Sequence, residues 1–123
     1  MNTEQLKHFN AQLMQGISVL EQLENLLEAE RKALSNRQLE EIQDKTEQKQ
    51  ALLTRYLELN KDRVTLLQSL GYTPDGDGVS NMISAAPPSA QTVLNDSWSK
   101  LQNKLSALQE SNKINGLISS RNL

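Results

Sequence analysis

A leucine recurs every seven residues along the first third of the chain. The five leucines of this repeat are Leu6, Leu13, Leu20, Leu27 and Leu34. Three further residues follow three positions after the first three leucines, namely Phe9, Gly16 and Leu23. This spacing places both sets on one face of a helix, as in the a and d positions of a coiled coil. It predicts one long amphipathic helix over residues 3–34, with Thr3 as the N-cap.

One position of this apolar face is a glycine, Gly16. Glycine in a helix interior costs about 1 kcal/mol relative to alanine, because its backbone loses more freedom on folding. Gly16 either lets a bulky side chain or another backbone approach the helix closely, or is an imperfection that the helix tolerates. The sequence alone favours the second explanation.

Apolar residues at helical spacing predict a second helix over residues 37–70, and Gly71 is its expected C-terminal cap. Ser35 and Asn36 interrupt the pattern between the two helices. Asn36 is a residue that can adopt the left-handed turn conformation, and either Ser35 or Asn36 could cap the second helix. Because the connection is short, the helices should be antiparallel neighbours in a hairpin. Polar runs in both helices fall near the turn, so we expect the tip of the hairpin to be solvated and thinly packed.

The segment 71–88 is rich in residues that break helices. The stretch from Gly71 to Ser89 contains all three prolines and three of the five glycines of the chain. It predicts a loop in which Val79, Met82 and Ile83 are spaced to form one short turn docked on the helices. Asp75 and Asp77 resemble a calcium loop only superficially, because no third oxygen ligand or closing glutamate follows in register.

A third helix is predicted over residues 89–119, with Ser89 as its cap. Its apolar face is formed by Leu94, Trp98, Leu101, Leu105 and Leu108. Asn112 and Asn115 then occupy positions where leucines are expected. These asparagines either weaken the packing of the helix end, so that Asn115→Leu would tighten the free protein, or set register and oligomeric state. The residues beyond them form an apolar patch that either docks a partner or packs on the hairpin: Ile114, Leu117 and Ile118.

Composition narrows the fold to a single all-α domain over residues 1–123. Aromatic residues make up only 3% of the chain, which argues against a β-sandwich or barrel. The pattern predicts a long antiparallel helical hairpin plus a third C-terminal helix, that is, a three-helix, coiled-coil-like bundle. Trp98 is then expected to anchor the third helix to the hairpin.

Charge and residue types exclude several classes of function. Thirteen basic and fifteen acidic side chains give a net charge of −2, so no nucleic-acid-binding surface is expected. The chain has no cysteine and one histidine, and no phosphate loop or hydrolase motif, so we expect no metal, no cofactor and no enzymatic activity. No apolar run approaches the roughly 20 residues that span a bilayer, and a cytoplasmic protein is expected.

Three features of the chain occur together in a fixed order. They are the acidic–basic run before Leu39-Glu40, the Leu70-Gly71 pair, and Trp98 followed by Asn112-x-x-Asn115-Gly116. In this combination the chain resembles the FlgN-type flagellar export chaperones over nearly its whole length. The resemblance implies a helical chaperone of bacterial flagellum biogenesis and no catalysis.

The resemblance also implies partners and a site. FlgN-type proteins bind the hook–filament junction proteins FlgK and FlgL in the cytoplasm and keep their C-terminal helical segments from associating. They deliver these clients to the export gate and ATPase apparatus of flagellar type III secretion. The family places client binding in its C-terminal helix. Carried over to this chain, the client-binding residues are Trp98, Leu101, Leu105, Leu108, Asn112, Ile114, Asn115, Leu117 and Ile118.

Two other functions fit the same helical pattern. A structural coiled-coil or self-association module without a dedicated client would expose the apolar stripes of the first two helices for pairing between chains, for example in a homodimer. A chaperone for a different flagellar export client, such as the filament-cap protein, would share the architecture. An export chaperone is expected to bury those stripes within its own chain and to leave the end of the third helix unsatisfied.

Overall fold

The protein is described by a computed structural model that covers residues 2–121, with the side chains of 114 and 116–121 left undescribed. Four helices follow one another: α1 (Thr3–Ser35), α2 (Leu39–Ser69), α3 (Gly76–Ser84) and α4 (Pro88–Arg121). Residues 2–121 contain no strand. The prediction of an all-α fold is therefore confirmed.

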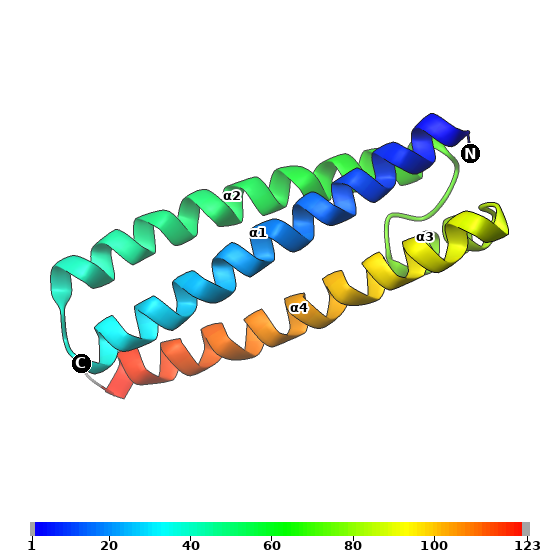
Figure 1. The fold of residues 1–123 in the computed structure, drawn as a ribbon. Helices are drawn as coiled ribbons and strands as arrows, with labels where there is room; N and C mark the ends of the chain where they lie inside the picture. The colour runs from blue at the N-terminus through cyan, green and yellow to red at the C-terminus, as the bar shows by residue number, and fades with distance from the viewer. Residues whose placement is uncertain (1, 122–123) are drawn as a thin grey trace.

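The helix α1 lies between α2 and α4 (Figure 1). α2 runs antiparallel to α1, whereas α4 runs in the same direction as α1 (Figure 1). Both long helices pack along α1, but no Cα atom of α2 lies within 8 Å of a Cα atom of α4 in the part of the chain that the structure describes. The hairpin thus forms as expected, while the third long helix packs on one arm of the hairpin instead of closing a tight three-helix bundle.

The leucine repeat explains why α1 is the shared helix. Four of its five leucines are buried to an exposed fraction of 8% or less, and Leu6 packs against the same core. Ile17, Val19 and Leu26 are also buried and widen the apolar stripe, so α1 can be contacted from two sides. α2 buries only Leu59 and Leu67 among its residues. Most of the core is therefore arranged along one helix.

The first helix begins at Thr3 as expected, but its cap is one residue earlier than expected. Its N-cap is Asn2, whose side chain accepts a hydrogen bond from the Gln5 backbone N–H (2.8 Å). The Gln5 side chain in turn accepts from the Asn2 backbone N–H (3.0 Å), which completes a capping box. The prediction of Thr3 as the cap was wrong because a capping box needs Glu or Gln three residues after the cap, and Leu6 stands three residues after Thr3.

The turns between the helices use two left-handed residues. Arg37 has a φ of 55° and reverses the chain between α1 and α2, whereas Asn36 has a φ of −94°. The left-handed residue of this turn is therefore Arg37 and not Asn36. Gly71 has a φ of 82° directly after Leu70, the C-cap of α2, so a glycine does end this helix as expected.

The segment expected to be a loop contains the nine-residue helix α3. Asp75 is its N-cap and accepts hydrogen bonds from the Gly78 backbone N–H (3.0 Å) and from the Thr73 hydroxyl (2.6 Å). The residues predicted to form a docked turn, Val79, Met82 and Ile83, are all at most 1% exposed. The loop prediction was therefore too broad, because a capping aspartate and a compact apolar face outweigh the neighbouring glycines.

Candidate binding groove

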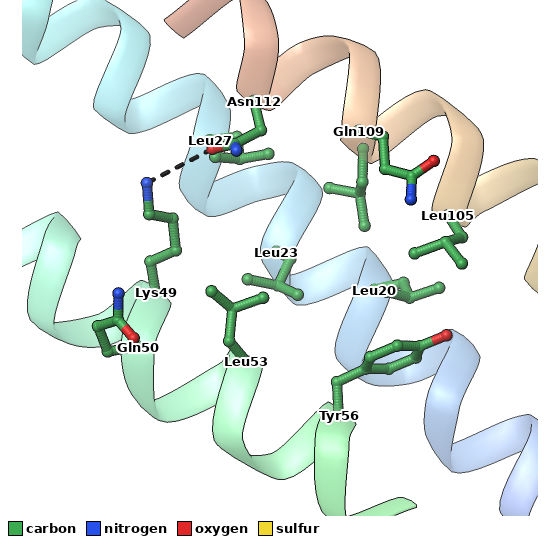
Figure 2. A pocket seen from close by; sticks show the side chains of 11 residues that line it. Leu20, Leu23, Leu27, Lys49, Gln50, Leu53, Tyr56, Leu105, Gln109 and Asn112 are labelled. Carbon is green, nitrogen blue, oxygen red and sulfur yellow. Dashed lines mark hydrogen bonds between the residues drawn. The ribbon is translucent and has the colours of Figure 1, made fainter. Parts of the chain in front are cut away.

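A groove of about 310 Å³ lies between α2 and α4 (Figure 2). Its floor is the middle of α1, which contributes Leu20, Leu23 and Leu27. The remaining lining residues come from the two flanking helices and are Lys49, Gln50, Leu53, Tyr56, Leu105, Leu108, Gln109 and Asn112. The groove exists because α2 and α4 both pack on α1 and leave a gap between each other that only side chains reach across.

The lining is apolar at its centre. Leu53 of α2 is 37% exposed and faces the groove together with Tyr56, opposite Leu105 of α4 (Figure 2). The volume is at the lower end of the range of about 300–1,000 Å³ that is usual for ligand pockets. A groove of this shape and size accommodates a few apolar side chains that project from one face of a helix lying along it.

One end of the groove is crossed by a lysine. Lys49 of α2 reaches α4, where its Nζ donates to Asn112 Oδ1 at 3.5 Å (Figure 2). The same Nζ pairs with Glu30 Oε2 at 3.0 Å. Lys49 therefore links all three long helices near the tip of the hairpin.

Glu30 and Asn115 form a buried polar network next to this lysine. Their exposed fractions are 5% and 2%. Asn115 donates through Nδ2 to the Leu27 carbonyl (2.8 Å) and to Glu30 Oε1 (2.9 Å), and its Oδ1 accepts from Arg31 Nε (3.0 Å). Of the two alternatives for the asparagines, weakened packing is wrong for Asn115, because every polar atom of its side chain is hydrogen-bonded to α1. The tip of the hairpin itself is solvated as expected, since residues 35–41 are all exposed.

The other end of the groove is narrow at Gly16. Because this residue has no side chain, side chains of the two flanking helices come close to α1 there. A Cβ atom there would lie 3.1 Å from Leu101 Cδ1 and 3.9 Å from Tyr56 Cε2. The glycine thus lets side chains of both flanking helices approach α1 closely. The structure supports this explanation over that of a tolerated imperfection, which the sequence favoured.

An arginine and the single tryptophan meet beyond this narrow point. The Arg63 guanidinium of α2 lies over the Trp98 ring of α4, 5.2 Å from the ring centroid. Trp98 is partly buried and packs against the core. Burial lowers the pKa of Arg63, while interaction with the neighbouring Tyr56 hydroxyl raises it.

The structure distributes the predicted site residues over three environments. Leu105, Leu108 and Asn112 line the groove. Leu101 and Asn115 are buried, and Trp98 lies beyond the groove next to Arg63. The predicted apolar patch consists of Ile114, Leu117 and Ile118, whose side chains are outside the described part of the chain.

The α2 wall of the groove was missed by the sequence analysis as a site. Leu53 belongs to a second apolar stripe on α2, and Leu57 on the same stripe is 64% exposed. Two parallel stripes on one helix signal more apolar surface than a single neighbour can cover. The second stripe on α2 is therefore a sequence feature from which this wall could have been found. The stripe alone does not show that this face borders α4.

Two features are absent from the residues that the structure describes. No cluster of three or more potential metal ligands occurs among them. None of their helices combines the length and apolar character needed to cross a membrane. The aspartates that superficially suggested calcium are explained in part by capping, since Asp75 caps α3.

Comparison with known proteins gives one match. A family model described as FlgN protein matches residues 1–123, the whole chain. No curated protein matches the chain, and no solved structure does. The four-helix architecture and the full-length match agree with the resemblance inferred from the sequence. The chain belongs to the FlgN family, a family of flagellar export chaperones.

Proposed function

We propose that this chain binds the hook–filament junction proteins FlgK and FlgL in the cytoplasm and masks their C-terminal helical segments. It then delivers them to the export gate and ATPase apparatus of flagellar type III secretion. The observation that carries this proposal is the open apolar groove between α2 and α4, which a monomer leaves exposed to solvent. An exposed apolar groove is typical of a protein that binds an amphipathic helix.

The groove can mask the client segment in a direct way. An amphipathic helix placed along α2 and α4 inserts side chains at i, i+3 or i+4 and i+7 against Leu23, Leu53 and Leu105. These are the side chains through which such a helix would otherwise associate with other copies. Leu108 and Asn112 extend the contact along α4, whereas Leu101 and Asn115 hold α4 on α1. The family resemblance adds Ile114, Leu117 and Ile118 as further proposed client-binding residues.

A carrier must also release its client. Affinities between about 1 μM and 1 nM, or roughly −8 to −12 kcal/mol, suit a complex that forms in the cell and is given up at the gate. A groove of modest volume, with polar residues at one end, is consistent with this intermediate range.

A structural coiled-coil module remains the second candidate function. The leucine repeat of α1 is buried within the same chain and is not available for pairing between chains. Self-association could instead use the two leucines of α2 that are more exposed than Leu53, namely Leu39 and Leu57, which are 80% and 64% exposed. These leucines lie outside the groove lining.

Co-purification with junction proteins tests the proposal. FlgK and FlgL are each produced full-length and without their C-terminal helical segments, and the filament-cap protein is included as another client. Stoichiometric binding of FlgK or FlgL that is lost with the truncation is the expected result. Binding of the cap protein alone would favour a chaperone for that client. No binding, together with a concentration-dependent dimer, would favour the coiled-coil module.

A further inference from the structure

The geometry points to Arg63 as the residue that receives a carboxylate of the helix bound in the groove. The inference rests on the proposed function, because it specifies the chemistry of the same client segment. The occupant is then an amphipathic helix that carries Asp or Glu at the end that lies next to Trp98.

Arg63 is a partly buried cation without an anion. Its guanidinium lies over Trp98 and donates to Asn60 Oδ1. No carboxylate among the described residues forms an ion pair with it. Burial disfavours its charged form, and its pKa is lowered accordingly. A carboxylate supplied from outside would compensate this desolvation.

The position of Arg63 relative to the groove follows from the register of α2 and α4. These helices are antiparallel, with Lys49 opposite Asn112 at one end and Arg63 opposite Trp98 at the other. The two cations are fourteen positions apart on α2, about 21 Å at the helical rise of about 1.5 Å per residue. Tyr56 lies between them, lines the groove and interacts with Arg63.

The charge pattern along the groove distinguishes its two ends. None of the groove-lining residues is acidic. Lys49 already pairs with Glu30 at 3.0 Å, so a client carboxylate at that end would compete with an internal ion pair. Arg63 has no such competitor among the described residues. Charge complementarity therefore places the acidic residue of the client at the Arg63 end only.

The chemistry of the arginine side chain also suits recognition of a carboxylate. A guanidinium has five N–H donors in one plane and binds a carboxylate through two parallel hydrogen bonds. The Arg63 guanidinium carbon lies 5.2 Å from the centroid of the Trp98 ring, at the distance of a cation–π contact. Its Nη2 donates to Asn60 Oδ1, and its other nitrogens carry further N–H donors for a carboxylate.

The test compares two peptides on the full-length protein by calorimetry. One peptide is the C-terminal helical segment of the junction protein that co-purifies, and the other has every Asp and Glu of that segment replaced by Asn and Gln. We expect the amide peptide to bind about tenfold more weakly to the unmodified protein. Arg63→Gln should remove this preference, and Arg63→Lys should keep part of it, because lysine retains the charge without the planar fork.

Arg55→Gln is the matched control, since Arg55 is an exposed arginine of α2 paired with Glu58 at 3.7 Å. It should preserve the tenfold preference. If Arg63→Gln still distinguishes the peptides tenfold while Leu53→Glu abolishes binding, the inference is overturned and the groove stands. If both peptides bind Leu53→Glu as tightly as the unmodified protein, the groove is not the site and the inference is overturned, whereas client binding itself stands; absence of binding to the unmodified protein would overturn the proposed function.

Discussion

At the scale of single residues, a polar cluster fastens α4 to α1 where an apolar seam was expected. Asn115 links the Leu27 carbonyl, Glu30 and Arg31, and Lys49 adds α2 to the same cluster. Buried polar groups of this kind are costly unless each finds a partner. Here the partners come from three helices, so the cluster fixes the position of α4 along α1.

Replacement of Asn115 by leucine should therefore destabilise the free protein. The leucine leaves Glu30 and Arg31 without one of their partners in a buried site, which costs about 1–3 kcal/mol. Urea unfolding measures the loss. Asn112→Leu is the control, because Asn112 is exposed and makes a single long hydrogen bond to Lys49. A more stable Asn115→Leu protein would contradict the role assigned to this network.

Replacement by alanine should have different effects on stability at two glycines of α3. A Cβ atom at Gly78 would lie 1.7 Å from the Thr73 carbonyl oxygen, so Gly78→Ala must displace the start of α3. At Gly76 a Cβ atom meets nothing within 4 Å. We expect Gly78→Ala to lower the midpoint of urea unfolding and Gly76→Ala to leave it unchanged or raise it, since alanine favours helix. Equal midpoints for the two variants would contradict the close contact at Thr73.

The sequence predicted the roles of some of these residues correctly and the roles of others incorrectly. Seven-residue spacing correctly identified the leucines of α1 as core, because burial of one helix face follows directly from periodicity. Asn115 and Gly16 were misjudged for a common reason. The role of each depends on which side chains of another helix lie opposite, and spacing within one helix does not contain that information.

At the scale of elements, α3 is the clearest difference from expectation. Nine residues among glycines and prolines form a helix because Asp75 caps it and three buried apolar side chains dock it, those of Val79, Met82 and Ile83. Composition marked the segment as a break between long helices, and this was correct. α4 begins at Pro88, however, so Ser89 lies within the helix and the prediction of Ser89 as its cap was wrong. A helix of this length depends on its cap and on tertiary contacts more than on propensity.

The cap of α3 should make its hydrogen-exchange protection depend on pH. The Thr73 hydroxyl and then the Gly78 backbone N–H stabilise ionised Asp75 and lower its pKa. Because the pKa is lower in the folded state, this contribution is present above the unfolded pKa of about 4 and is lost as the pH falls through the folded value. As the pH falls through the folded pKa of Asp75, hydrogen-exchange protection of the α3 amides should decrease in the unmodified protein. The decrease should be smaller in Asp75→Asn, because asparagine caps the helix without a charge. Identical pH profiles would contradict this account of the cap.

At the scale of the whole molecule, the groove results from one helix serving two neighbours. The stripe on α1 is wide enough for α2 and α4, which then stand apart and leave between them a groove whose floor is formed by Leu20, Leu23 and Leu27. The sequence indicated three long helices and the family. It did not indicate the gap, because periodicity states which residues are apolar and not whether the two outer helices touch each other.

The most direct measurement of the central claim is client capture by two leucine variants of α2. Leu53 lines the groove, whereas Leu57 lies one turn further on the same helix, is 64% exposed and is not part of the lining. Leu53→Glu and Leu57→Glu are each co-purified with a full-length junction protein. Loss of the client with Leu53→Glu and retention with Leu57→Glu is the predicted result. Equal retention of the client by both variants would show that it binds elsewhere on the protein.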